Sequence, residues 1–375
     1  MTAGQGGRSV RGGRIERVEA AAYTVPTDAP EADGTLAWDA TTMVVVEAGC
    51  GDESGLGWTY APAAAAAAVS GLLRDVVVGR DPLDVPGAHE AMVRAVRNAG
   101  RPGLVGDALS AVDMALWDLK ARLLGLPLPE LIGRVREDVP VYGSGGFTTY
   151  HDTRLATQLT GWAHGQGIPR VKIKIGESWG RDVARDLARV RHARETIGPG
   201  TDLYVDANGA YTRKQAVRVG RALAELGVVW FEEPVSSDDL EGLRVVRDAC
   251  DCDVAAGEYG HDLPYFARMA PVVDCLQADA TRCGGFTEWL RAAAVAQAHG
   301  LEISGHCAPH LHAQVAACVP NLRHIEWFHD HVRIETALFT GALDPAGGTV
   351  RPGASGEPGH GMRLKREEAE PCRVL

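Results

Sequence analysis

The strongest constraint on the fold is a series of ionisable residues that follow short strand-like runs. From residue 139 onward, β-rich runs alternate with helical stretches rich in Ala, Arg and Leu, which is typical of repeated βα units around a parallel sheet. Seven runs end in an ionisable residue, at intervals of 20 to 32 residues: Lys174, Asp206, Glu232, Glu258, Asp279, His306 and Glu326. A closed barrel brings such side chains together on one face, whereas an open sheet spreads them along a line. We therefore predict an α/β fold with a closed parallel barrel.

The chain before the barrel predicts a smaller α+β domain. Apolar runs between residues 13 and 60 are separated by Gly-rich turns, as in antiparallel strands, and residues 106–125 show helical spacing that ends at Gly125. The predicted parts are a disordered N-terminus at 1–12, the α+β domain at 13–138, the barrel at 139–344, and a C-terminal segment at 345–375 that returns to the first domain.

Three of the strand-end residues are acids on consecutive strands. Asp206, Glu232 and Glu258 are 26 residues apart in each step. Three carboxylates in one pocket repel one another, so they either stay protonated or hold a cation. An all-oxygen set with open positions suits Mg²⁺. We predict that these acids bind Mg²⁺ and that Asn208, two residues after Asp206, supports its outer shell.

Two lysines in the stretch "RVKIKIGE", residues 170–177, share one face of a strand. Lys172 and Lys174 are two residues apart, so their ammonium groups lie close together. A neighbouring cation favours loss of a proton from a lysine. We predict that Lys174 removes the proton α to a substrate carboxylate, and that Mg²⁺ and Lys172 stabilise the resulting enediolate.

Asp279 and His306 end the next two strands after the last predicted metal ligand. A carboxylate that binds one imidazole nitrogen fixes the tautomer of the ring and raises its pKa. We therefore expect His306 to be an acid/base group oriented by Asp279. Lys174 and His306 then approach the substrate from opposite sides of the barrel.

Six motifs, "KIK", "DAN", "EEP", "GE", "DATRCGG" and "SGH", occur in an order and at spacings that resemble the enolase superfamily, and within it the mandelate racemase subgroup. The resemblance covers nearly the whole chain and implies a modified TIM barrel, (β/α)7β, with an N-terminal α+β capping domain. It implies a Mg²⁺-dependent enzyme with Lys174 and His306 as its two bases. It also implies that Glu326 donates a proton to a substrate carboxylate oxygen, and that Glu232 is the metal ligand while Glu233 points away into packing.

The resemblance leaves the outcome of the reaction open. Dehydration of an acid sugar, an aldonic or aldaric acid, to a 2-keto-3-deoxy acid is common among members of the subgroup that keep both bases. The alternative is a racemase or epimerase of an α-hydroxy or related carboxylic acid. Cycloisomerisation normally places a second lysine where this chain has His306. A non-catalytic binding protein is disfavoured because the ligands, the bases and the orienting Asp279 are all present.

Residues outside these motifs are weaker candidates for substrate contact. The stretches 24–40 and 55–61 are expected to be loops over the barrel mouth, the first a lid, and they offer Trp38 and Tyr60. Ser144, at the end of the first barrel strand, could contact a substrate hydroxyl. The pairs His310/His312 and His329/His331 have a spacing used by zinc hydrolases, but they come late in the chain, outside the strand ends.

Charge and composition predict which partners the chain binds. The formal net charge of −11, with no run of basic residues, argues against nucleic acid, and the predicted partner is a small carboxylate. The most apolar low-complexity stretch, residues 61–73, is too short to cross a membrane, and residues 1–14 lack the apolar run that export signals carry, so we expect neither a membrane partner nor export. Eight scattered cysteines fit a cytoplasmic protein with reduced thiols. By analogy with relatives we expect a homo-oligomer, a dimer or an octamer.

Overall fold

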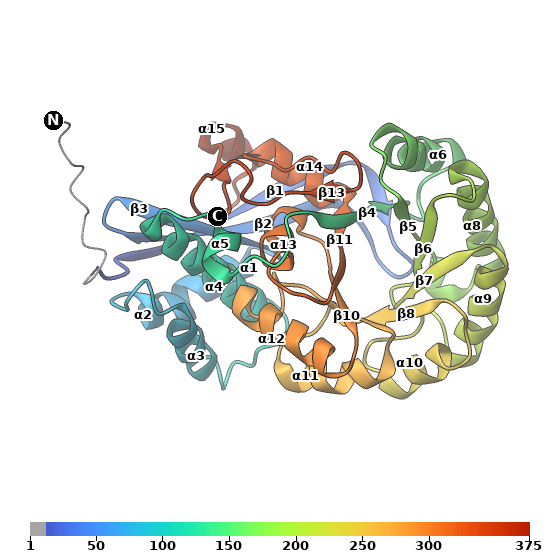
Figure 1. Ribbon diagram of the computed structural model, residues 1–375, viewed down its shortest axis with the longest axis horizontal. Coiled ribbons are helices and arrows are strands. Elements are labelled where there is room, and N and C mark those ends of the chain that lie inside the picture. Colours follow the sequence, from blue (N-terminus) through green and yellow to red (C-terminus); the bar gives the residue numbers. More distant parts are fainter. Residues whose placement is uncertain (1–12) are drawn as a thin grey trace.

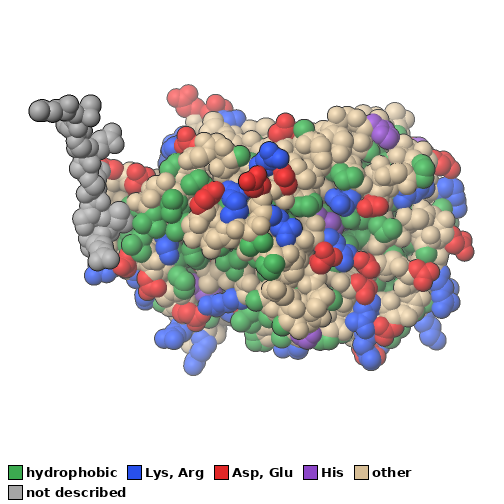
Figure 2. Space-filling view, in the orientation of Figure 1, with side chains coloured by type: hydrophobic (Ala, Val, Ile, Leu, Met, Phe, Trp, Pro, Cys, Tyr) green, Lys and Arg blue, Asp and Glu red, His purple; other side chains and the backbone are tan. Residues whose placement is uncertain are grey.

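The computed structural model describes residues 13–375, so the predicted disorder of 1–12 lies outside the described residues. Figure 1 shows the barrel on the right, and on the left a small sheet with its own helices. This is the α/β barrel with an N-terminal α+β cap that the sequence predicts. On the face drawn in Figure 2, basic and acidic side chains are interspersed.

Eight parallel strands form the barrel, and pairing of the last with the first closes it. Each strand ends near one of the ionisable residues of the sequence series or, for the first strand, near Ser144. The strands in order are β4 (Val139–Gly145), β5 (Arg170–Lys174), β6 (Asp202–Asp206), β7 (Val228–Glu232), β8 (Asp253–Ala256), β9 (Cys275–Ala278), β10 (Glu302–Gly305) and β11 (Leu322–Phe328).

Helices connect successive barrel strands and cover the outside of the barrel (Figure 1). Their apolar faces pack against the outward side chains of the strands in one large core. They are α6 (Asp152–Thr160) with the π-turn Gly161–Gly165, α7 (Glu177–Gly180), α8 (Val183–Ile197), α9 (Arg213–Glu225), α10 (Leu240–Arg247), α11 (Leu263–Met269) with the 3-10 turn Ala270–Val272, α12 (Gly285–Ala298), α13 (Pro309–Ala316) and α14 (His329–Leu338).

The capping domain is an antiparallel sheet, β1 (Arg17–Ala32), β2 (Ala37–Cys50) and β3 (Glu53–Tyr60), packed on α4 (Leu104–Leu124). Gly125 ends α4 in the left-handed region, as its position in the sequence predicts. Shorter helices complete the domain: α1 (Ala64–Ala68), the π-turn Val69–Leu73, α2 (Arg74–Val77), α3 (Val85–Ala95) and α5 (Leu128–Ile132). No helix within residues 13–375 has both the length and the apolar character to cross a membrane.

The expectation of a lid loop at 24–40 is wrong, because most of this stretch belongs to the hairpin β1–β2. Its prolines are tolerated because β1 is an edge strand, and a register shift lies between Pro26 and Glu31. The tip of the hairpin is tied to the barrel. Thr148 N donates to Ala32 O at 2.8 Å, and Trp179 N donates to Gly34 O at 2.9 Å.

The C-terminal segment contacts both parts of the molecule. β13 (Thr349–Val350) pairs with β4, and β12 (Phe339–Thr340) pairs with β14 (Arg363–Leu364). After α15 (Arg366–Ala369) and the 3-10 turn Glu370–Cys372, Val374 N donates to Ala22 O in β1 at 2.8 Å. The last residues therefore extend the contacts of the capping sheet.

Glycines in β3 allow α4 to approach the sheet closely. A Cβ on Gly57 would lie 2.3 Å from the carbonyl oxygen of Ala111 and 2.5 Å from the nitrogen of Ala115. Gly57→Ala is therefore expected to lower the free energy of unfolding by about 2–3 kcal/mol, because backbone atoms would have to separate. Urea denaturation followed by circular dichroism measures this.

The control for this variant is Gly71→Ala, because a methyl group added at Gly71 would have no neighbouring atom of the described residues within 4 Å. It should stabilise the helical turn by about 0.5–1 kcal/mol. Equal stability of Gly57→Ala and the parent chain would contradict the close approach of α4 to β3.

Candidate active site

Alternation along the barrel strands produces two layers inside the barrel. The lower layer consists of aromatic rings: Tyr142, Tyr204, Trp230 and His324, whose ring centroids lie 4.7–5.4 Å apart along the contacting pairs. Two residues further along β6, β7 and β11, the inward side chains are acidic, and the lysines of β5 lie in the same upper layer. The aromatic layer therefore forms an apolar floor beneath a set of polar groups at the barrel mouth.

Both lysines of β5 point into the charged layer. Lys172 is fully buried and its Nζ lies 2.5 Å from Glu232 Oε1, 2.8 Å from Glu326 Oε1 and 3.7 Å from Asp206 Oδ2. Lys174 donates a short hydrogen bond to Asp206. Burial lowers the pKa of Lys174 most, and Lys172 lowers it further, but the carboxylates of Asp206, Glu326 and Glu232 together hold the pKa above its ordinary value. The expectation that Lys172 favours loss of a proton from Lys174 is therefore incomplete, because the nearby carboxylates act in the opposite direction.

The three predicted metal ligands meet in one cluster. One carboxylate oxygen from each of Asp206, Glu232 and Glu258 lies within 4.8 Å of the others, and all three side chains are buried. Asn208 follows Asp206 with a positive φ of 45°, and its backbone N donates to Asp206 Oδ1 at 2.8 Å. Such a set of oxygens, held together by three strands, fits a hard divalent cation.

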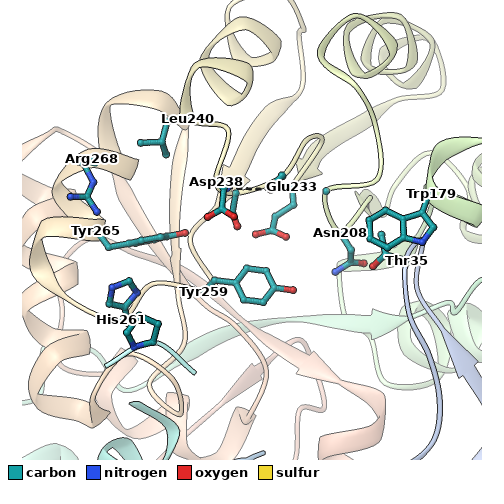
Figure 3. A pocket seen from close by; sticks show the side chains of 14 residues that line it. Thr35, Trp179, Asn208, Glu233, Asp238, Leu240, Tyr259, His261, Tyr265 and Arg268 are labelled. Atoms are coloured by element: carbon teal, nitrogen blue, oxygen red, sulfur yellow. Dashed lines mark hydrogen bonds between the residues drawn. The ribbon is translucent and has the colours of Figure 1, made fainter. Parts of the chain in front are cut away.

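Glu233 departs from its expected place in packing. Its φ of 37° turns the chain after β7, and its side chain, 1% exposed, points into a separate cavity of about 740 Å³ (Figure 3). Its Oε1 has no hydrogen-bond partner among the described residues. Adjacent glutamates thus point to different places, Glu232 into the charged cluster and Glu233 into this cavity, because the strand ends between them.

His306 and Asp279 form a directly bonded pair. His306 Nδ1 lies 2.8 Å from Asp279 Oδ2, and Thr281 fixes the other oxygen, Oδ1, through its N and Oγ1, both at 2.7 Å. Burial lowers the pKa of His306, but Glu258 and Asp279 raise it above its ordinary value. Lys174 and His306 come from β5 and β10, which are at least three strands apart around the barrel.

Glu326 accepts hydrogen bonds on both oxygens, from Ser144 Oγ at 2.6 Å and Cys307 N at 2.8 Å. Burial raises its pKa, but Lys172 and His306 outweigh burial and hold the pKa well below the ordinary value. The carboxyl is therefore ionised in this arrangement. The proton-donor role implied by the resemblance requires a bound substrate to raise the pKa of Glu326. Ser144 is fully buried, does not line the cavity and donates its hydroxyl to Glu326, so its contact with a substrate hydroxyl stays a prediction.

A cavity of about 500 Å³ opens over the charged layer, between the barrel and the capping domain. Trp38 and Tyr60 both line it, as expected of substrate-contacting residues. Trp38 Nε1 donates to Glu31 at 2.9 Å. The Tyr60 ring stacks on His331 with the ring centroids 3.3 Å apart, and its hydroxyl donates to Glu335.

Arg282 and His331 are among the cavity residues that sequence reasoning missed. Arg282 lies 3.1 Å from Glu258 Oε1 and 3.6 Å from Asp279 Oδ2, so it neutralises part of the acid cluster. The sequence feature that could have identified Arg282 is its position three residues after Asp279 in "DATRCGG". His331 lines the cavity with a pKa lowered to about 4, chiefly by burial, and its only signal was the His329/His331 spacing.

The other histidine pair lies outside the site. His310 binds Glu335, and His312 accepts a hydrogen bond from the backbone N of Ala280 at 2.9 Å. Both side chains are buried and neither lines the cavity. Their spacing therefore reflects packing of α13, as the late position of the pair in the chain indicates.

The capped barrel, its buried acid cluster and its acid/base pairs define a class of barrel enzymes with the active site between the two domains. The chain belongs to the mandelate racemase/muconate lactonizing enzyme family of the enolase superfamily. The model for the "Mandelate racemase / muconate lactonizing enzyme, N-terminal domain" matches residues 32–133, and the model "Enolase C-terminal domain-like" matches 154–369.

Relatives of this chain catalyse several reactions. L-talarate/galactarate dehydratase of Salmonella typhimurium is 30% identical over 88% of this chain and 86% of the relative. D-galactarolactone cycloisomerase of Agrobacterium fabrum is 35% identical over 74% of each chain. L-Ala-D/L-Glu epimerase of Bacillus subtilis is 26% identical over 93% of this chain and 96% of the relative. The chain is thus an enzyme whose relatives include dehydratases, cycloisomerases and epimerases.

Solved structures agree with the fold over its full length. A mandelate racemase/muconate lactonizing enzyme-like protein from Rubrobacter xylanophilus has a TM-score of 0.93 at 52% identity, over 96% of this chain and all of that chain. The Salmonella dehydratase liganded with Mg and L-lyxarohydroxamate has a TM-score of 0.89 at 28% identity, over all of this chain and 96% of that chain.

Proposed function

We propose that this protein dehydrates an acid sugar to a 2-keto-3-deoxy acid, by removing the proton α to its carboxylate. The observation that carries the proposal is the placement of Lys174 and the His306–Asp279 pair across the barrel mouth, on either side of three clustered carboxylates. Acid sugars are proposed as the substrates because the relatives named above include a dehydratase of such acids.

The metal proposed for this site is Mg²⁺, held by Asp206, Glu232 and Glu258. The fit rests on three buried carboxylate oxygens within 4.8 Å, a cluster whose mutual repulsion a cation relieves. When bound, Mg²⁺ stabilises negative charge that develops on the substrate carboxylate. The relative's structure with Mg and L-lyxarohydroxamate supports this choice.

The proposed steps assign one proton transfer to each side of the cavity. Lys174 takes the α proton, and the electron pair of that C–H bond forms the enediolate. The enediolate then expels the β-hydroxyl, which leaves as water after accepting a proton from His306, and the enol tautomerises to the 2-keto acid. Burial and Lys172 oppose the ammonium form of Lys174, whereas Asp206 stabilises it, so these three effects contribute to how readily Lys174 accepts a proton.

Epimerisation is the second candidate, because His306 is equally placed to return a proton to the opposite face of the α carbon. Proton NMR of the protein with Mg²⁺ in D₂O, against a panel of aldonic, aldaric and α-hydroxy acids, separates the outcomes. A 2-keto-3-deoxy product supports dehydration. Deuterium at the α carbon without loss of water means epimerisation, and ring opening or closure of a lactone means cycloisomerisation.

A further inference from the structure

Part of the cavity lining, beside the acid/base groups, is apolar. Leu36, Trp38, Tyr60 and Pro62 of the capping domain line it, together with Phe328 at the end of β11. Trp38 is held in place by Glu31 and packs edge-on against Phe147 at 5.5 Å. These residues therefore offer mainly carbon surface to a ligand, because the hydroxyls of the lining residues Thr41 and Thr42 already bond Asp330 and Thr24.

Every basic side chain that lines this cavity, among residues 13–375, already has a partner. Lys174 contacts Asp206, and Arg282 lies between Glu258 and Asp279. His306 is bound to Asp279. His331 accepts a hydrogen bond from Ala308 N through Nδ1, and its low pKa of about 4 leaves the ring neutral. The described part of the capping domain contributes no basic side chain to the lining.

One acidic side chain outside the catalytic cluster, in contrast, lines the same space. Asp33 lines the cavity from the turn of the β1–β2 hairpin. Asn208 and Tyr259 line both this cavity and the neighbouring one, whose lining includes Glu233 and Asp238 and also the basic residues His261 and Arg268 (Figure 3). Within this cavity, a second carboxylate on a substrate would thus lose water without gaining a free positive partner, and Asp33 would repel it.

Resting on the function proposed above, we infer that this enzyme acts on monocarboxylic acids with an uncharged, partly apolar far end, and that the hairpin tip at Leu36 and Trp38 excludes dicarboxylic acids. Aldonic and 6-deoxyaldonic acids fit this description, whereas aldaric acids do not. The chain thereby differs from the Salmonella relative, whose named substrates, talarate and galactarate, are dicarboxylates.

The test compares acids that share their configuration and differ only at the far carbon: an aldonic acid, its 6-deoxy analogue and the aldaric acid. Rates of α-proton exchange and of keto-acid formation are measured for each set with Mg²⁺ in D₂O. We expect kcat/KM for the aldonic or deoxy acid to exceed that for the matched aldaric acid by at least tenfold. A preference for the aldaric acid overturns this inference while supporting the proposed function. Exchange with none of the acids overturns the proposed function itself.

A charge introduced at the hairpin tip tests the same inference from the protein side. Leu36 is 65% exposed in the turn, so Leu36→Arg should fold normally, which thermal denaturation checks. We expect this variant to raise relative activity on the aldaric acid by at least fivefold and to lower it on the deoxy acid. Leu36→Gln, of similar length but uncharged, should keep the preference for uncharged far ends. An equal shift in both variants would mean that shape and not charge sets the preference, which contradicts the inference.

Discussion

Replacing Lys174 with alanine is expected to lower kcat by at least about 10³-fold, because a positioned general base contributes about 10²–10⁴-fold and no other described side chain on that side of the cavity is placed to substitute. Lys172 lies deeper, fully buried between Glu232 and Glu326, so its ammonium is held away from the cavity. Exchange of the α proton with solvent deuterium should be lost together with product formation. Steady-state kinetics and proton NMR measure the two effects.

The control for this variant is Lys214→Ala, which removes an exposed lysine from α9 and should leave kcat within about twofold. Circular dichroism of Lys174→Ala shows whether the variant still folds, which must be checked because the change removes the hydrogen bond to Asp206. Retention of exchange in Lys174→Ala, with loss in His306→Asn, would assign proton removal to His306 and reverse the proposed roles.

Glu232→Gln is expected to lower kcat/KM by at least about 10³-fold at a fixed Mg²⁺ concentration, and to weaken Mg²⁺ binding by at least tenfold. The change removes one of three negative ligands, and it also leaves the buried ammonium of Lys172 without its nearest carboxylate. Titration calorimetry with Mg²⁺ measures binding directly, and activity as a function of Mg²⁺ concentration shows whether excess metal restores turnover.

The neighbouring residue supplies a matched control. Glu233→Gln makes the same chemical change one position later, where the side chain faces the other cavity and is not among the three clustered acids. Its Mg²⁺ affinity should stay within about threefold of the parent chain. If Glu233→Gln abolished Mg²⁺ binding and Glu232→Gln did not, the proposed ligand set would be wrong.

The sequence alone determined the architecture because strand ends are periodic. Each βα unit returns the chain to the same face of the barrel, so the residues from Lys174 to Glu326 had to converge once the barrel closed. Alternation along β5 likewise placed Lys172 and Lys174 on one face of the strand. These are local, repeating rules, and they need no knowledge of distant contacts.

Tertiary structure alone decided where the side chains next to these positions point. The positive φ of Glu233 turns it into a second cavity, and Ser144 is bound to Glu326, a partner 182 residues away. The apolar part of the cavity lining depends on the hairpin tip reaching the barrel loops through Thr148 and Trp179. Contacts of this kind join residues with no regular spacing, so periodicity carries no signal for them, and they are fixed only when the two domains pack together.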